Sequence, residues 1–195
     1  MTVPISDLGQ PASGQGLIMP LIKYRFRILF IGFGAGKSTL ELTKQVVDFK
    51  RPSLTFDEQE IDVYNSKIHY AGKPKWSDTE VALRDDMQGA VSTLVGQQIQ
   101  KTFDFGQQSS ASSGKDYKFE MLCEMLDGGN GANEPVVLNT FDMVGCYIKS
   151  VDYDSLDYKS SDPVMIKLGI TFDNCIQTPG GIGAAVQRTL GTIAI

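Results

Sequence analysis

The segment Gly32–Ser38 has the residue types of a phosphate-binding loop, because several glycines precede a lysine and a serine. A loop of the form G-x-x-x-x-G-K-[ST] needs a glycine five residues before Gly36, and Ile31 occupies that position. A phosphate loop also runs from a buried strand into a helix, whereas the pattern here predicts a second strand. We therefore interpret the segment as an exposed hairpin turn. A nucleotide-binding enzyme using Gly32–Ser38 is the alternative from a different functional class.

The other side chains suited to catalysis or metal binding are one histidine, His69, and three cysteines, Cys123, Cys146 and Cys175. A single histidine excludes zinc motifs with paired histidines, and His69 is predicted to lie on a strand surface. The cysteines are odd in number and form no C-x-x-C pair, which predicts reduced thiols in a cytoplasm. No nucleophile elbow surrounds any of them. The sequence therefore predicts no catalytic, cofactor-binding or metal-binding residue, and no enzyme.

A short acidic run, Asp152-x-Asp154-x-x-Asp157, has part of the pattern of a calcium loop. It lacks the third ligand position, the glycine and the distal glutamate that such a loop requires. We interpret it as a solvated turn.

Composition places the chain among ordinary globular proteins. It has 195 residues, of which 42% are hydrophobic and 21% charged, which predicts one domain with flanking arms. Glycine and proline mark the proposed boundaries, giving an arm over 1–22, a domain over 23–173 and a tail over 174–195. No run reaches the roughly 18 apolar residues of a membrane span. A net charge of −5 disfavours a nucleic-acid-binding surface.

Alternation of apolar and polar residues dominates the central domain and predicts strands. The long predicted strands are Tyr24–Ile31, Tyr117–Leu126 and Val164–Phe172. Shorter predicted strands are Glu41–Phe49, Gln59–Tyr64, Lys67–Ala71, Thr79–Leu83, Val136–Phe141 and Cys146–Tyr153. The fold class is therefore mainly β, an antiparallel barrel or sandwich with one packed helix.

One segment repeats with the helical period of 3.6 residues. Its apolar stripe comprises Met87, Ala90, Val91, Leu94, Val95 and Ile99. Asp85 or Asp86 is expected to cap the helix N-terminus, and the stripe is expected to pack under the sheet.

Charge is distributed unevenly along the chain. Residues 1–51 hold seven basic and three acidic side chains, whereas residues 120–157 hold eight acidic side chains and one lysine. Such a monomer could stack head to tail, although solvated strands and loops would account for the same counts.

Several segments resemble the tail tube family of contractile-tailed bacteriophages, which is related to the tubes of contractile injection and type VI secretion systems. The resemblance covers residues 23–173 and depends on the order and spacing of elements. Its residues are Phe49-Lys50-Arg51-Pro52-Ser53-Leu54, Val63-Tyr64-Asn65-Ser66-Lys67, Tyr70-Ala71-Gly72-Lys73-Pro74-x-Trp76, Arg84-Asp85-Asp86, Leu138–Tyr147, Ser150-Val151-Asp152-Tyr153 and the strand Val164–Phe172. The arms and the Gly/Ser-rich insertions depart from the compact form of that family.

This resemblance implies a structural protein of the virion tail, assembled in the host cytoplasm. It implies homohexameric rings, whose subunits pool strands into an inner β-barrel, stacked into a tube through which DNA passes without specific binding. The implied partners are the tail sheath protein and the baseplate and tail terminator proteins. A baseplate or terminator paralogue, or the inner tube of an injection or secretion system, is the alternative within the same class.

The proposed surface residues of this assembly are charged. Alternation points Glu120 and Glu124 away from the apolar face of their strand. Together with Asp152 and Asp154 they are expected either to line a channel that is not basic or to contact a stacked ring. In the second case, Arg25 and Arg27 of that ring are the expected partners.

Overall fold

The computed structural model describes residues 21–35, 39–128, 135–159 and 161–179. The first half contains β1 (Phe26–Ile31), α1 (Leu40–Gln45), β2 (Val46–Phe49), β3 (Leu54–Val63), β4 (Ser66–Trp76), β5 (Thr79–Arg84) and α2 (Ala90–Thr102). The second half contains β6 (Phe103–Asp104), β7 (Ser109–Ser110), α3 (Gly114–Tyr117), β8 (Phe119–Leu126), β9 (Val137–Tyr153), β10 (Met165–Thr171) and β11 (Asn174–Thr178). The expectation of a mainly β, antiparallel fold is confirmed.

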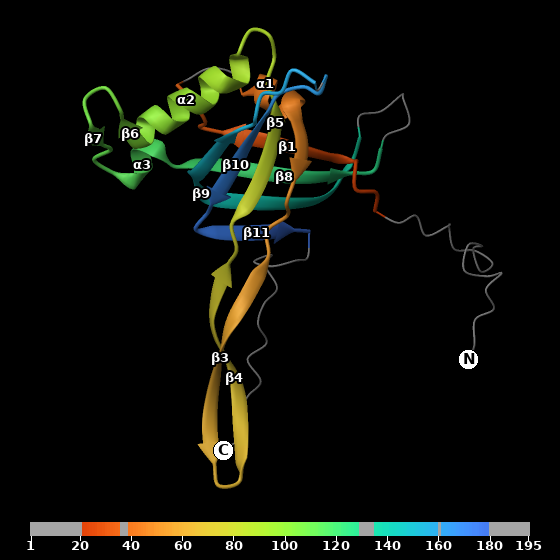
Figure 1. Cartoon of the computed structure of the whole chain (residues 1–195). Helices are drawn as coiled ribbons and strands as arrows, with labels where there is room; N and C mark the ends of the chain where they lie inside the picture. Colours follow the sequence, from red (N-terminus) through yellow and green to blue (C-terminus); the bar gives the residue numbers. More distant parts are fainter. Residues whose placement is uncertain (1–20, 36–38, 129–134, 160, 180–195) are drawn as a thin grey trace, which may run out of the picture.

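Seven strands form one folded sheet in the order β1-β8-β9-β10-β5-β2, with β11 also pairing β9. In Figure 1, β8 and the first part of β9 run across the direction of β5 and β10. Buried side chains from both parts meet in one core cluster. The body is therefore a sheet wrapped around its own apolar face, which resembles a sandwich. Among the described residues, no helix is long and apolar enough to cross a membrane.

Strand β9 holds the two parts of the sheet together. Its first residues pair with β8, and its last residues, Tyr147–Tyr153, pair with β10. The change of partner comes between Cys146 and Tyr147, next to Gly145, which has a φ of 73°. A β-carbon there would come within 2.7 Å of the Asp173 carboxyl carbon, and Lys118 holds that carboxylate at 2.5 Å. Glycine thus allows one strand to bend between two sheet directions.

The long predicted strands are present, and the apolar faces of β1, β8 and β10 are those that alternation predicted. Some predicted members of these faces lie outside the strands, because Tyr117 belongs to helix α3 and Val164 precedes β10. On β8, Phe119, Met121, Cys123 and Met125 are buried and alternate with partly exposed residues. The start of the first strand differs from the prediction, because Tyr24 precedes β1 and is 72% exposed. The predicted strands Val136–Phe141 and Cys146–Tyr153 form the single strand β9.

The prediction of a strand over Glu41–Phe49 is wrong in its first half. Residues Leu40–Gln45 form helix α1, and only Val46–Phe49 form a strand. Leu42 is fully buried in the core. The residues before Val46 are mostly unbranched at Cβ and suit a helix, whereas β-branched residues begin at Val46. A helix, not a second strand, therefore follows the Gly32–Ser38 segment.

Helix α2 has the predicted stripe but a different start. Val91, Leu94 and Val95 are buried, whereas Met87 lies outside the helix and is fully exposed. The N-cap position is Gly89 in the left-handed conformation, not Asp85 or Asp86 as predicted. Both carboxylates still accept hydrogen bonds from backbone amides of the first turn. Asp86 accepts from the Ala90 amide at 2.9 Å, and Asp85 accepts from the Ser92 amide at 3.4 Å.

A long hairpin of β3 and β4 projects away from the body (Figure 1). The sequence predicted two short strands here, Gln59–Tyr64 and Lys67–Ala71. The structure extends them to 10 and 11 residues, nearly all exposed. A bulge places Asp57 opposite Gly72 and Lys73. At Gly72 a β-carbon would come within 2.8 Å of the Asp57 carbonyl oxygen, so glycine permits this close approach.

The bend at Gly145 can be tested by substitution. Gly145→Ala forces a left-handed conformation on alanine and a contact with Asp173, so we expect a loss of about 2 kcal/mol or more in the free energy of unfolding. The melting temperature in thermal unfolding should fall by roughly 4 °C or more. Gly96→Ala is the matched control: Gly96 is exposed within α2 with open space at its β-carbon, so this variant should be unchanged or more stable. A Gly145→Ala variant as stable as the wild type would contradict the assigned role of this bend.

Candidate assembly surfaces

The outward-facing side of β8 carries the two glutamates singled out from the sequence. Glu120 and Glu124 alternate with the buried residues of the strand, as predicted. Glu124 forms an ion pair with Arg27 of β1 at 2.6 Å, and its side chain is 14% exposed. The opposing strands place these residues directly across from one another in the antiparallel register. Arg27 and Glu124 are thus paired within one chain.

Glu120 has an acidic neighbour. The carboxyl of Asp142, on β9, lies within hydrogen-bonding reach of it. Partial burial of Glu120, followed by the negative charge and hydrogen bond of Asp142, raises the pKa of Glu120 above its ordinary value. One oxygen of Asp142, Oδ1, is buried without a hydrogen-bond partner. This pair therefore brings two carboxyl groups close together on the outer side of the sheet.

The remaining sequence candidates lie elsewhere. Arg25 donates to the Asp127 carbonyl oxygen at 2.5 Å and lies over the Tyr24 ring. Asp152 pairs across the sheet with Lys167 of β10, and Asp154 follows the end of β9. The structure therefore groups Arg25, Arg27, Glu120 and Glu124 near β1 and β8, and separates Asp152 and Asp154 from them.

A polar hollow of about 590 Å³ lies on the outer side of β5, β9 and β10. Lys50, Lys149 and Lys167 line it together with four carboxylates, Asp48, Asp78, Glu80 and Asp152. The signs of charge are mixed, and the floor contains the small residues Ala82 and Gly169. Nothing in this surface favours retention of a polyanion.

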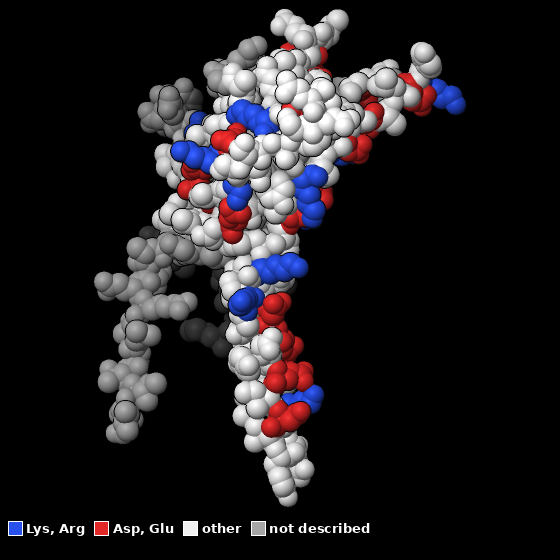
Figure 2. Space-filling view, turned by 90° about the vertical axis from the view of Figure 1, so that its left-hand side faces the viewer, with Lys and Arg blue, Asp and Glu red and all other residues white. Residues whose placement is uncertain are grey.

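Sequence reasoning missed the amphipathic character of the projecting hairpin. Its apolar face consists of Ile61, Val63, Ile68 and Tyr70, each between 44% and 55% exposed. Its charged face consists of Glu58, Glu60, Asp62, Lys67 and His69. Figure 2 shows the acidic side chains gathered along one side of the hairpin. Alternation on both sides of the turn Tyr64–Asn65 was the signal that could have revealed this face.

The base of this hairpin is fastened to the body by Asp78. One carboxylate oxygen contacts Lys149 Nζ at 2.5 Å, and the other accepts from the Thr171 hydroxyl at 2.8 Å. The bond from Lys149, reinforced by Thr171, lowers the pKa of Asp78. Trp76 also packs on Phe172, with ring centroids 5.6 Å apart. The direction of the hairpin is therefore fixed where it leaves the sheet.

The groups considered for chemistry are poorly placed for it. Burial raises the pKa of Cys123 and Cys146 to about 12 and that of Cys175 to about 11, so these thiols stay protonated. Lys37 and its neighbours Gly36 and Ser38 lie outside the described residues. Asp157, the last residue of the acidic run, accepts from the Lys159 amide at 3.0 Å, as in a turn.

Proteins with a similar fold occur in contractile injection systems. A chain in the anti-feeding prophage baseplate has 10% identity and a TM-score of 0.55, covering 83% of this chain and 97% of that one. A chain in the sheath/tube terminator of the extracellular contractile injection system PVC has 13% identity and a TM-score of 0.56, covering 84% and 100%. A chain in the PVC sheath-tube complex has 14% identity and a TM-score of 0.54, covering 90% and 98%.

These likenesses show the fold over nearly the whole length of the similar chains. No protein-family model matches the chain, and no curated protein matches its sequence.

The raised pKa of Glu120 predicts a pH-dependent stability effect. A folded-state pKa above the unfolded value gives stability that is present at low pH and lost as the pH rises through the folded pKa. Glutamine stays neutral at every pH, so Glu120→Gln should not lose this stability as the pH rises. The variant should therefore have a higher melting temperature than the wild type at pH 7, and the two melting temperatures should converge below the ordinary glutamate pKa. Glu124→Gln is the control: it breaks the Arg27 pair and should give no gain. Equal melting temperatures of Glu120→Gln and wild type at pH 7 would refute the interpretation.

Proposed function

We propose that this chain is a structural subunit that assembles with copies of itself into stacked rings, forming the tube of a contractile machine. The observation that carries the proposal is the exposed apolar face of the β3–β4 hairpin, which no other described element packs against. An isolated two-stranded hairpin is marginally stable in water, and a second layer on its apolar face would stabilise it. A repeating assembly supplies that layer from a neighbouring copy.

The edges of the sheet support the same proposal. Among the described residues, β1 pairs only with β8, and β2 only with β5. Each therefore presents one edge with unpaired backbone groups, and exposed edges favour pairing with another chain. In a closed ring, a neighbour covers each edge without open-ended growth. Six copies per ring is the number that the resemblance to tail tubes implies.

Charged residues on the outer surfaces suit a channel for a polyanion. We propose that Glu120, Glu124, Asp152 and Asp154 line this channel or a ring-stacking surface. The pair of Arg27 and Glu124 within one chain means that stacking does not require Arg27 to reach a second ring. A channel of mixed or negative charge would let DNA slide, because strong binding to phosphate needs clustered cations.

The machine we propose is a contractile phage tail, with the sheath, baseplate and tail terminator as partners and DNA as the passing molecule. The similar chains of known structure support a second candidate, the tube or terminator of an extracellular contractile injection system. Growth distinguishes a tube from a terminator, because a tube protein forms long homopolymers and a terminator stops at a single ring.

A non-enzymatic role is part of this proposal. The three thiols are buried and protonated, and the single histidine lies on the exposed hairpin. A nucleotide-binding enzyme remains the rival from another class, and a nucleotide titration of the full chain tests it. Saturable binding of ATP that is lost in Lys37→Ala would support the rival.

The hairpin allows a matched test of assembly. Ile61→Ser with Ile68→Ser removes one cross-strand apolar pair, and Asp62→Ser with Lys67→Ser removes the adjacent pair on the charged face. We expect the apolar variant to remain a folded monomer by sizing and thermal unfolding, and to form no rings or tubes in electron microscopy. The charged-face variant should assemble like the wild type. Normal tubes from the apolar variant would contradict the assigned role of the hairpin, and a wild type that is monomeric at every concentration would contradict the proposed function.

A further inference from the structure

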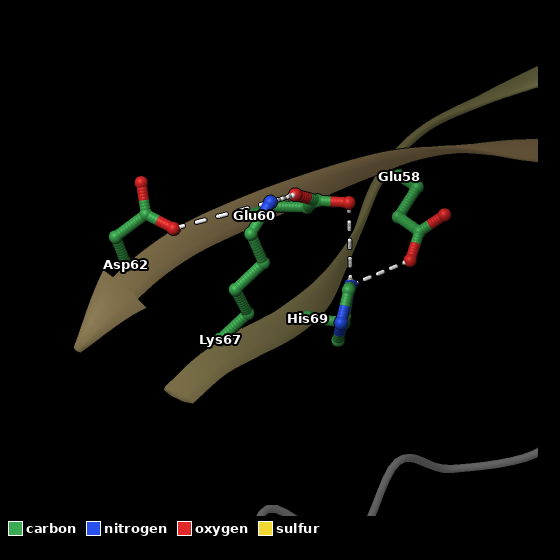
Figure 3. Close-up of polar contacts among 5 residues, drawn as sticks. All are labelled: Glu58, Glu60, Asp62, Lys67 and His69. Carbon is green, nitrogen blue, oxygen red and sulfur yellow. Dashed lines mark hydrogen bonds and ion pairs between the residues drawn. The ribbon is translucent and has the colours of Figure 1, made fainter. Parts of the chain in front are cut away.

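The charged face of the hairpin brings three potential metal ligands together. Glu60 and His69 are cross-strand partners, and Glu58 lies two residues before Glu60 on the same face. The Nδ1 atom of His69 lies 2.7 Å from Glu58 Oε1 and 3.8 Å from Glu60 Oε1 (Figure 3). One ligand atom from each residue can be chosen such that all three lie within 4.8 Å of one another. His69 is the only histidine of the chain.

Lys67 sets the orientation of one of these ligands. Its ammonium group contacts Glu60 Oε2 at 2.6 Å, on the side away from the histidine. The other oxygen, Oε1, is left facing His69. Hydrogen-bonded partners behind a ligand fix its orientation, while the positive charge of Lys67 opposes a nearby cation. Lys67 therefore acts as a positioning residue.

Charge and access also favour a cation. The face carries the carboxylates of Glu58, Glu60 and Asp62 against one lysine, so its net charge with a neutral histidine is negative. The three ligand side chains are between 45% and 66% exposed, and an ion can reach them from solvent. The bulge at Asp57 lies next to Glu58 and helps to fix the strand register that aligns the ligands.

We propose that Glu58, Glu60 and His69 form a binding site for a divalent transition-metal ion, with Zn²⁺ as the best fit. Imidazole nitrogen with carboxylate oxygen is a common zinc ligand set, whereas Ca²⁺ and Mg²⁺ prefer six or more oxygen ligands. Tetrahedral bonds of about 2.0–2.2 Å would place the ligand atoms roughly 3.4 Å apart. His69 and Glu58 would separate slightly and His69 and Glu60 would approach each other, which small side-chain movements allow. Three protein ligands leave a fourth position for water.

The proposal goes beyond the tube function and departs from the sequence-based expectation of no metal-binding residue. A lone histidine excludes paired-histidine motifs, but not a mixed site with two glutamates on an adjacent strand. An ion at this position would link β3 to β4 partway along the hairpin. Such an ion would stiffen the β3–β4 hairpin, whichever surface the hairpin contacts.

Metal binding can be measured on the full chain without an affinity tag. Titration calorimetry with Zn²⁺ and the visible absorption of bound Co²⁺ report affinity, stoichiometry and ligand geometry. We expect one ion per chain, with affinity at least about tenfold lower in His69→Gln and in Glu58→Gln. Asp62→Asn is the matched control, because it removes one negative charge from the same face outside the ligand set, and it should change affinity less than threefold.

Three results would overturn the site. Unchanged affinity in His69→Gln would do so, as would equal losses in Asp62→Asn and Glu58→Gln, which would indicate diffuse attraction to an acidic surface. Absence of binding by the wild type would also overturn it. The buried thiols are not competing ligands in the folded chain, and thermal unfolding of each variant shows that it is folded. These experiments measure metal binding and not ring assembly. A negative result would therefore contradict the metal site without contradicting the proposed tube function.

Discussion

The bend of β9 at Gly145 is the constraint on which the other elements depend. A single strand pairs with β8 and β11 up to Cys146 and with β10 from Tyr147 onward. The sheet can therefore turn over its own apolar face and close a core from both of its parts. A positive φ and the nearby Asp173 carboxylate make glycine necessary at this position. Without the bend, the two parts would remain one flat sheet with an uncovered apolar face.

The body and the hairpin are stabilised in different ways. The body buries a continuous cluster that includes Ile28, Leu83, Met121 and Leu168. The hairpin buries almost none of its side chains, yet carries an apolar face about as regular as that of a core strand. This division is expected of a subunit whose folding is independent but whose arm is completed by a neighbour. The exposed apolar face of the hairpin is thus the surface through which we propose that the chain assembles.

Alternation predicted the fold class and the faces of β8 and β10 because a half-buried strand must repeat every two residues. It failed at Leu40–Gln45, where Leu42 reaches the core from a helix, since short apolar stretches fit both periods. It also missed β11, because Cys175 is the only fully buried residue of that short strand. The grouping of Glu58, Glu60 and His69 depends on cross-strand register, which a bulge at Asp57 shifts by one residue. Periodicity within one strand carries no information about that shift.

The base of the hairpin is held to the body by polar and aromatic contacts together. Asp78 joins the β4–β5 connection to Lys149 of β9 and Thr171 of β10. The lowered pKa of Asp78 keeps this link charged throughout the neutral pH range. Trp76 packs on Phe172 beside it. Force applied to the hairpin would therefore pass into β10 and the part of β9 that pairs with it, and from there into the core of the body.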